Sequence, residues 1–265
     1  MPDMRYAVHA LRYAQSVGER SSYFYRYDLS GEPDGRQDID WYFWLLQGNG
    51  KTVLVDCGFD QERAARKGRY GGTDPRELLS RAGVRAADVD HVIISHAHYD
   101  HVGNIGLFPQ ATFTMARSEY QWITGPYADR FPTCWTVERE ERDLIENLHR
   151  DGRFTLVDGR TEVFPGIEVR PVGGHTPGQT LTEVTTDSGQ IVLASDAAHL
   201  YEELEQDKPF NMLHDLDRMF ATYEELRELS ARPGTSVIAG HDPIVGRSHA
   251  EVEPDCFDLT RPVGP

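Results

Sequence analysis

Apolar runs and polar segments alternate along the first hundred residues in an order that predicts strand, helix and strand. Residues 41–57 (WYFWLLQGNGKTVLVDC) contain two apolar runs around a GNG turn, which is a good signal for a β-hairpin. Residues 73–83 (TDPRELLSRAG) predict a short helix that Asp74 caps and Gly83 ends. Residues 89–95 (VDHVIIS) predict a buried strand. This alternation is typical of a layered α/β domain.

The second half of the chain has the same alternation, and each of its strands stops at a polar residue. The run GIEVRPVGG predicts a strand that stops before His175. Residues 181–195 (LTEVTTDSGQIVLAS) predict a hairpin that runs straight into Asp196. SVIAG, which we expect to be the last strand, stops at His241.

The middle of the chain is less regular. Residues 111–124 (ATFTMARSEYQWIT) predict a strand and a short helix that starts at Ser118. Residues 126–160 contain a loop and a charged helix, and they are the best candidate for a substrate-facing insertion or lid. A plain surface helix with its loop is the alternative. Further on, the amphipathic segment 215–234 predicts a helix whose apolar stripe we assign to the core.

Side chains that can bind metal ions follow four of the predicted strands. Together they are His96, His98, Asp100, His101, His175, Asp196 and His241. The first four lie within SHAHYDHVGN (95–104), where such crowding would resist burial unless something between the side chains bound them all. Because layered α/β proteins build their sites at strand ends, we expect all seven to meet.

The number and type of these side chains predict two metal ions. Neutral imidazole suits zinc, and carboxylates suit zinc, manganese or iron. Seven such groups exceed what one tetrahedral ion needs, and they fit two ions about 3.5–4 Å apart that share a carboxylate and a hydroxide. We therefore expect two divalent ions, Zn²⁺ first, with Mn²⁺ or Fe²⁺ as alternatives.

Composition narrows the classes of partner. With 265 residues, of which 39% are hydrophobic, the chain can bury one sizeable core. Lys and Arg number 27 against 43 Asp and Glu, for a formal net charge of −16, so we expect no nucleic-acid or membrane partner. No signal peptide or membrane span is apparent, and the three cysteines match no disulfide or zinc spacing. The expectation is a cytoplasmic protein with a small-molecule substrate; a homodimer stays open.

Several motifs resemble one family. HAHYDH (96–101) fits the H-x-H-x-D-H motif of the metallo-β-lactamase superfamily. GGHTPGQT (173–180), ASDAAH (194–199) and AGHD (239–242) stand where that superfamily places its remaining ligands. LVDCG (54–58) is similar to the strand end that precedes the first motif. The resemblance extends over nearly the whole chain and implies an α/β fold, a four-layer αββα sandwich, with a dinuclear metal site along one edge of the sheets.

The resemblance also implies one such domain over residues 1–265, with the insertion at 126–160.

The resemblance implies a role for each candidate residue of the metal site. Asp56 is similar to a carboxylate that orients a ligand histidine. The implied ligands are His96, His98 and His175 for the first ion, Asp100, His101 and His241 for the second, and Asp196 as the bridge between them.

Individual positions distinguish the branches of this superfamily. Asp196 stands where antibiotic-cleaving lactamases of the common type carry cysteine, and His98 stands where flavodiiron-type proteins carry a carboxylate. The spacing of 21 residues from His175 to Asp196, and of 45 more to His241, resembles acyl-homoserine lactonases and pyridoxolactonase-like hydrolases. One departure is His199, because such lactonases usually carry a tyrosine at that position.

The resemblance predicts a metal-dependent hydrolase that opens a lactone, or a related cyclic ester or amide, by attack of a hydroxide that bridges the two metals. A glyoxalase-II-like thioesterase and an iron-dependent redox or oxygen-handling protein on the same fold are the alternatives. Asp100 is the expected proton shuttle. His199 is the candidate oxyanion donor, expected as a neutral ring beside two cations, and its alternative role is a hydrogen bond within the loop.

Aromatic side chains near the N-terminus are candidates for a wall of the substrate pocket. Core packing is the stronger expectation for most of them, because aromatics are large hydrophobic groups. Tyr23 and Tyr25 precede the polar loop DLSGEPDGRQD and are the better placed to face a ligand. The full set is Tyr23, Phe24, Tyr25, Trp41, Tyr42, Phe43 and Trp44.

Overall fold

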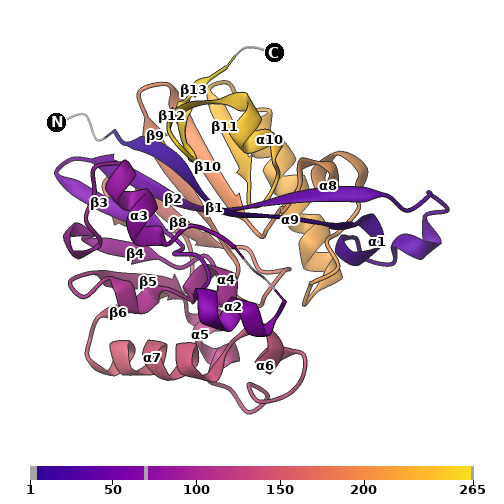
Figure 1. The fold of residues 1–265 in the computed structure, drawn as a ribbon, viewed down its shortest axis with the longest axis horizontal. Helices are drawn as coiled ribbons and strands as arrows, with labels where there is room; N and C mark the ends of the chain where they lie inside the picture. Colours follow the sequence, from indigo (N-terminus) through magenta and orange to yellow (C-terminus); the bar gives the residue numbers. More distant parts are fainter. Residues whose placement is uncertain (1–4, 69–70, 264–265) are drawn as a thin grey trace.

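The computed structural model describes residues 5–68 and 71–263 and shows two β-sheets packed face to face, with helices outside them (Figure 1). The eight-stranded sheet has the order β12-β13-β1-β2-β3-β4-β5-β6, and the five-stranded sheet has the order β11-β10-β9-β8-β7. The strands of the first sheet are β1 (Ala7–Glu19), β2 (Arg36–Gly48), β3 (Lys51–Val55), β4 (His91–Ile93), β5 (Thr112–Ala116), β6 (Phe154–Val157), β12 (His249–Glu253) and β13 (Cys256–Pro262). Those of the second are β7 (Thr161–Phe164), β8 (Ile167–Pro171), β9 (Thr180–Thr186), β10 (Gly189–Ser195) and β11 (Thr235–Ala239).

Helices connect these strands and cover the outer faces of both sheets (Figure 1). The described α-helices are α1 (Arg20–Tyr23), α2 (Gln61–Arg66), α3 (Pro75–Arg81), α4 (Tyr99–Val102), α5 (Arg117–Ile123), α6 (Thr133–Thr136), α7 (Arg139–Arg150), α8 (Tyr201–Gln206), α9 (Leu216–Ser230) and α10 (Ile244–Ser248). Short 3₁₀ turns lie at Tyr27–Leu29, Ala86–Asp88 and Ile105–Leu107. No helix in the described part of the chain is long and apolar enough to cross a membrane.

Three apolar layers hold the sandwich together, and strand β2 shows how they are separated. Successive side chains of a strand point to opposite faces of the sheet. Trp44 and Leu46 therefore pack between the two sheets, whereas Phe43 and Leu45 pack outward beneath the helices. A third cluster lies between the second sheet and α9, where Met219 is buried. Helix, sheet, sheet and helix are thus stacked in order, which confirms the expected four-layer αββα sandwich.

The local signals of the first half are confirmed with small shifts in their bounds. Strands β2 and β3 form the predicted hairpin, and Asn49 and Gly50 at its turn have φ of 52° and 70°, the left-handed geometry that a tight hairpin turn needs. The first strand starts five residues earlier than its apolar run, at Arg36. Asp74 caps α3 by accepting a hydrogen bond from the N–H of Arg76 at 2.8 Å.

The expectation that SVIAG forms the last strand is wrong. Strands β12 and β13 follow β11 and return to the first sheet, where β13 pairs antiparallel with β1. β12 reads HAEVE and lies at the sheet edge, with most of its side chains exposed. An edge strand with solvent on both faces needs no apolar run, so the hydrophobic pattern carried no signal for it.

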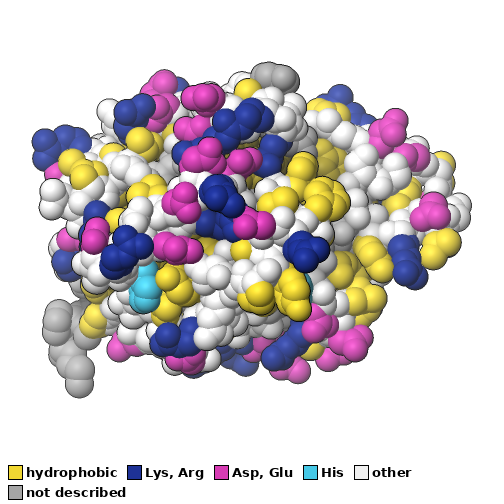
Figure 2. All heavy atoms as spheres, turned by 90° about the horizontal axis from the view of Figure 1, so that it is seen from below, with side chains coloured by type: hydrophobic (Ala, Val, Ile, Leu, Met, Phe, Trp, Pro, Cys, Tyr) yellow, Lys and Arg dark blue, Asp and Glu magenta, His cyan; other side chains and the backbone are white. Residues whose placement is uncertain are grey.

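Segment 126–160 contains α6, the predicted charged helix α7 and strand β6. Ion pairs tie this segment to the region around α2. Lys67 Nζ lies 2.8 Å from Glu138 Oε1, and Arg63 lies 3.3 Å from the buried Glu141. On the face shown in Figure 2, basic and acidic side chains are interspersed rather than gathered into fields of one sign.

Candidate metal centre

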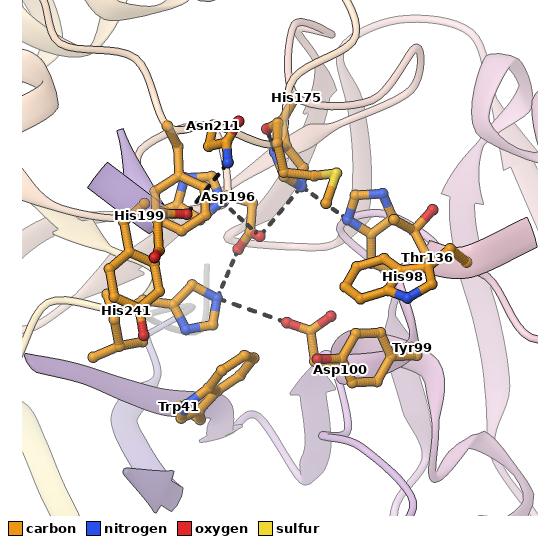
Figure 3. Close-up of a pocket in the computed structure, with 16 residues that line it drawn as sticks. Trp41, His98, Tyr99, Asp100, Thr136, His175, Asp196, His199, Asn211 and His241 are labelled. Carbon is orange, nitrogen blue, oxygen red and sulfur yellow. Dashed lines mark hydrogen bonds and ion pairs between the residues drawn. The ribbon is translucent and has the colours of Figure 1, made fainter. Parts of the chain in front are cut away.

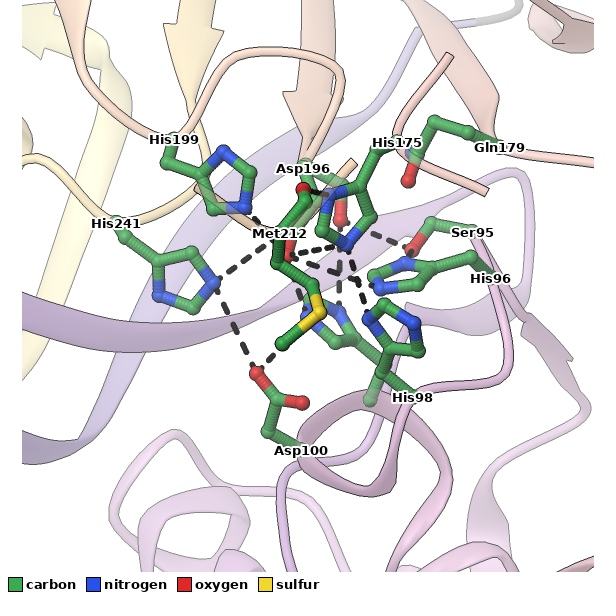
Figure 4. A network of polar contacts seen from close by, with 12 residues as sticks. Ser95, His96, His98, Asp100, His175, Gln179, Asp196, His199, Met212 and His241 are labelled. Carbon is green, nitrogen blue, oxygen red and sulfur yellow. Dashed lines mark hydrogen bonds and ion pairs between the residues drawn. The ribbon is translucent and has the colours of Figure 1, made fainter. Parts of the chain in front are cut away.

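The seven candidate ligands meet at one edge of the sandwich, where strands of both sheets end (Figure 4). The HAHYDH segment follows β4 of the first sheet and continues into α4. His175, Asp196 and His241 follow β8, β10 and β11 of the second sheet. All seven residues are buried, with at most 6% of the surface of each exposed. The packing of the two sheets therefore brings together ligands that are up to 145 positions apart in the sequence.

The first group of ligand atoms comes from His96, His98, His175 and Asp196, and these atoms lie within 4.8 Å of one another. His98 Nδ1 lies 2.9 Å from His175 Nε2. Asp196 Oδ2 lies 3.3 Å from His175 Nε2 and 3.7 Å from His96 Nε2. Three imidazoles and one carboxylate form a complete ligand set for one tetrahedral ion.

The second group comes from Asp100, His101, Asp196 and His241, again within 4.8 Å of one another. The other oxygen of the shared carboxylate, Asp196 Oδ1, lies 3.0 Å from His241 Nε2 and 3.3 Å from His101 Nε2. Asp100 Oδ2 lies 3.3 Å from His101 Nε2. Asp196 thus presents one oxygen to each group, and the division of the ligands is the one that the sequence motifs imply.

The donor atoms fit divalent cations. Among the described residues, His96 Nε2 and His101 Nε2 are buried without a hydrogen-bond partner, which is rare for polar atoms unless a ligand occupies the space. Burial lowers the pKa of His98 to about 4, and burial also lowers the pKa values of His96 and His175 well below the ordinary value of a histidine. These rings are therefore neutral at physiological pH, as ligands of zinc must be.

Hydrogen bonds on the far side of the rings fix which nitrogen faces the centre. His175 Nδ1 lies 2.7 Å from the carbonyl oxygen of Met212, and His241 Nδ1 lies 2.9 Å from that of Asp40. His101 Nδ1 lies 2.8 Å from Asp56 Oδ2. Each of these oxygens accepts the Nδ1 proton, so the Nε2 lone pair points into the site. This arrangement is typical of histidines that hold metals.

Asp56 occupies the position expected for a carboxylate that orients a ligand. Besides its contact with His101, it accepts hydrogen bonds from the N–H and the hydroxyl of Ser95 at 2.8 and 2.7 Å. Its backbone has φ of 62°, and Ser195 on the facing strand end has φ of 46°. Such strained residues gather at functional sites, where the surrounding contacts hold them in place.

His199 faces the same centre but belongs to neither ligand group. Its Nε2 lies 3.0 Å from Asp196 Oδ2, and its Nδ1 lies 3.3 Å from Glu203 Oε1. Its ring stacks on Phe210, with 3.7 Å between the ring centroids. Within residues 5–68 and 71–263, neither ring nitrogen has a hydrogen-bond partner of good geometry, and only 2% of the residue is exposed.

Burial lowers the pKa of His199, but the carboxylates of Asp196 and Glu203 outweigh that effect and raise it to about 9. Two bound cations would act in the opposite direction, so the neutral ring expected from the sequence stays a prediction. Glu203 is a neighbour that the sequence did not single out. Glu203 is fully buried, accepts hydrogen bonds from the Leu200 N–H at 2.9 Å and from the Tyr223 hydroxyl at 2.5 Å, and occupies the third position of α8. In the sequence, a glutamate at this position indicates only a helix-capping role.

A cavity of about 230 Å³ opens over the two ligand groups (Figure 3). Five of the candidate ligands line it, namely His98, Asp100, His175, Asp196 and His241, and His96 and His101 complete the two ligand groups. We call all seven the metal floor. The aromatic wall consists of Tyr23, Trp41, Tyr99, Trp135 and Phe210, all of which line the cavity. The remaining lining residues are Ser22, Ile39, Thr136, His199, Asn211 and Met212. No Lys or Arg lines this cavity in the part of the chain that the structure describes.

The structure divides the aromatic candidates. Tyr23 and Trp41 face the cavity, as does Trp135 from segment 126–160, whereas Tyr25 is not among the lining residues. Phe43 and Trp44 are fully buried in the core. Phe210 was not a candidate, because nothing in its surrounding sequence distinguishes it from an ordinary loop aromatic.

The four-layer sandwich with two His and Asp ligand groups at one edge defines a binuclear metalloprotein. Residues 42–242 match the family model of the metallo-β-lactamase superfamily. The chain belongs to this superfamily.

Relatives and solved structures agree with the family. An N-acyl homoserine lactonase of Azorhizobium caulinodans is 32% identical over 227 residues, which cover 76% of this chain and 81% of that protein. One from a Bacillus species is 27% identical over 220 residues, which cover 77% and 82%. The crystal structure of a quorum-quenching N-acyl homoserine lactone lactonase superimposes with a TM-score of 0.75 at 21% identity, covering 97% of this chain and 100% of that one. A structure described as a dizinc quorum-quenching lactonase gives a TM-score of 0.74 at 18% identity, covering 91% and 89%.

Proposed function

We propose that this chain is a metal-dependent hydrolase that opens the ring of a neutral lactone, with N-acyl homoserine lactones as the first class to test. The observation that carries the proposal is a single cavity with the metal floor at its base and the aromatic wall around it. The floor suits attack on a carbonyl, and the wall suits an apolar acyl group. The named activities of the relatives support the same class.

The charge of the cavity favours a lactone over a glutathione thioester. Glutathione carries carboxylates, which proteins recognise with Arg or Lys. The described lining contains neither residue, and it already holds Asp100 and Asp196. A neutral ring ester with an apolar substituent avoids this repulsion, so we rank the glyoxalase-II-like thioesterase second.

The seven residues of the metal floor would hold two divalent cations, which, when bound, lower the pKa of water and polarise the substrate carbonyl. Water adds to the carbonyl carbon and the ring C–O bond breaks, giving a hydroxy acid. Asp100 lines the cavity and supplies the carboxylate that takes a proton from the attacking water and returns it to the leaving alkoxide oxygen.

His199 is placed to contact the substrate rather than a metal ion. Its ring is held by stacking on Phe210, and its buried nitrogens have no good hydrogen-bond partner. A ring N–H beside the floor can donate to the carbonyl oxygen as negative charge develops there. The histidine would thus replace the tyrosine hydroxyl found in acyl-homoserine lactonases.

A substrate panel with matched chemistry tests the proposal. Purified enzyme loaded with zinc should hydrolyse N-acyl homoserine lactones or simple γ-lactones faster than S-lactoylglutathione or a β-lactam. Higher kcat/KM on the thioester would overturn the lactonase assignment. Elemental analysis tests the remaining alternative, an iron-dependent redox or oxygen-handling protein. Such a protein would contain iron and consume oxygen, whereas the hydrolase should work with zinc.

A further inference from the structure

A buried carboxylate outside both ligand groups joins the two loops that carry the first group. Glu119 lies on α5, directly after β5, and none of its surface is exposed. Its Oε1 accepts a hydrogen bond from the N–H of Ala97, and its Oε2 accepts one from the N–H of Gly178, both at 2.9 Å. Ala97 lies between His96 and His98, and Gly178 lies three residues after His175.

We propose that Glu119 is a positioning residue that fixes the separation of these two loops and thereby the affinity of the first metal site. The proposal rests on the proposed function only through its assignment of the ligands, and it requires no particular substrate. Each oxygen of one rigid carboxylate holds one loop, so the distance between the loops is set by the width of the carboxylate.

The packing around this contact leaves little freedom. A Cβ atom at Gly178 would lie 2.4 Å from the backbone nitrogen of Glu119, so only glycine lets the loop approach the helix this closely. A second contact, from the N–H of Thr180 to the carbonyl oxygen of Ser95 at 2.9 Å, joins the same two segments. These contacts hold His98 Nδ1 and His175 Nε2 2.9 Å apart, close enough to share one ion.

The effect should be confined to one of the two sites. The hydrogen bonds of Glu119 reach the loops of His96, His98 and His175, whereas the second group is oriented elsewhere. His101 is held by Asp56, and His241 by the carbonyl oxygen of Asp40. Loss of Glu119 should therefore weaken one ion and leave the other bound.

Glutamine is the sharpest replacement, because it keeps the shape of the side chain but has only one oxygen. Its NH₂ group cannot accept a hydrogen bond, so one of the two loops loses its partner. Residues that orient metal ligands from outside typically contribute about 10- to 100-fold to affinity. We expect Glu119→Gln to lower the affinity for one zinc ion by that factor.

Glu141 provides a matched control. It is also a buried glutamate, with 1% of its surface exposed, and it accepts a hydrogen bond from the backbone N–H of Glu138 at 3.1 Å. Among the described residues, none of its hydrogen bonds or ion pairs reaches either ligand loop. Glu141→Gln should therefore affect stability through a lost buried contact while leaving both zinc affinities unchanged.

The experiment measures zinc binding to the full-length protein after removal of metal with a chelator. Competition titrations with a chromophoric chelator give two dissociation constants for wild type, Glu119→Gln and Glu141→Gln, and melting curves with and without zinc give the stabilisation by metal. We expect one weakened constant and a smaller zinc-induced shift in Tm for Glu119→Gln alone. Equal losses at both sites, or wild-type constants for Glu119→Gln, would overturn the proposal.

A second variant covers the case in which Glu119→Gln does not fold. Glu119→Asp keeps the charge but is too short to reach both N–H groups, so it should also weaken one zinc ion. Two wild-type constants for this variant would likewise overturn the proposal. Lactone hydrolysis by the wild type is measured separately. If the wild type binds two zinc ions but opens no lactone, the proposed substrate class fails and the role of Glu119 stands.

Discussion

The metal floor and the aromatic wall share one cavity but are built in different ways. The floor consists of buried side chains at strand ends, and its rings are held by further hydrogen bonds to Met212, Asp40 and Asp56. Two residues of the wall lie on the same scaffold, Trp41 on β2 and Tyr99 on α4, but the other three come from separate connections. Tyr23 lies beyond the end of β1, Trp135 lies on α6, and Phe210 lies between α8 and α9.

This difference assigns the two parts different tasks. A metal centre requires ligand positions accurate to fractions of an ångström, which packed sheets and supporting hydrogen bonds provide. Substrate preference requires a surface that can change without disturbing those positions, and loops on a rigid scaffold provide it. Substitutions in the floor should therefore change metal content, whereas substitutions in the wall should change KM and substrate preference.

The largest effect is expected from Asp196→Ala. Because Asp196 presents one oxygen to each ligand group, both ions should be lost or weakened together, and activity should fall by roughly 10³-fold or more. His241→Ala should mainly weaken the second ion. Elemental analysis with zinc titration measures both. If the two variants lose the same single ion, the assignment of the bridge is wrong.

His199 lies where floor and wall meet, and its substitution should separate chemistry from metal binding. His199→Ala should lower kcat/KM by roughly 10- to 1000-fold, as the loss of one oxyanion donor does, with zinc content unchanged. His199→Tyr should shift preference toward simple lactones. Steady-state kinetics on a lactone series measure this. Wild-type kinetics in both variants would show that His199 has only a structural role.

Tyr23 and Tyr25 provide a matched pair within the wall region. Tyr23 faces the cavity beside Phe210, with 5.7 Å between the ring centroids, whereas Tyr25 does not line it. Tyr23→Ala should raise KM by about 3- to 30-fold through lost apolar contact, and Tyr25→Ala should leave it unchanged. Both variants should keep two zinc ions. Loss of folded protein in Tyr23→Ala would instead assign Tyr23 to the core.

The smallest effect concerns the buried Glu141 and should appear in the stability of the protein rather than in its turnover. Burial raises the pKa of Glu141, near the start of α7, to about 8. Between about pH 4.5 and 8 the unfolded chain has lost this proton and the folded chain retains it. The stabilisation is therefore fully present at low pH and is lost as pH rises toward 8, by at most about 1.4 kcal/mol per pH unit.

Urea unfolding of the zinc-loaded protein between pH 5 and 8.5 measures this slope. Glu141→Gln has no proton to lose and should show a shallower dependence on pH than the wild type. Identical slopes would show that Glu141 is ionised in the folded state. The buried Glu119, whose pKa burial raises to about 7, adds a similar contribution in both proteins.

The floor was predictable and much of the wall was not, for a physical reason. His96 to His101 form a local motif, and the other ligands follow apolar runs, so sequence shows both their chemistry and their place at strand ends. Trp135 and Phe210 lie in connections without periodicity, and only the packing of distant segments decides that they face the cavity. Tyr25 was a wrong candidate for the same reason.

Supporting residues were also hard to identify. Glu119 lies in the helical segment RSEYQWI, where a glutamate is indistinguishable from a solvent-exposed one. Its burial follows from the docking of the Gly178 loop, which the local sequence does not encode. Glu203 is a similar case, because its position suits a helix cap as well as a contact with His199. Buried charges beside a site become visible only when the tertiary structure is known.

The division of the ligands between two sheets has a consequence for the lifetime of the protein. An ion held by His96 and His98 from one sheet and by His175 and Asp196 from the other is a removable cross-link between the halves of the sandwich. Its contribution depends on free metal, reaching about 4 kcal/mol when the metal exceeds its dissociation constant a thousandfold. Proteases act on transiently opened chains in proportion to their population. Metal supply in the surroundings thus sets how long each molecule survives, as well as how fast it works.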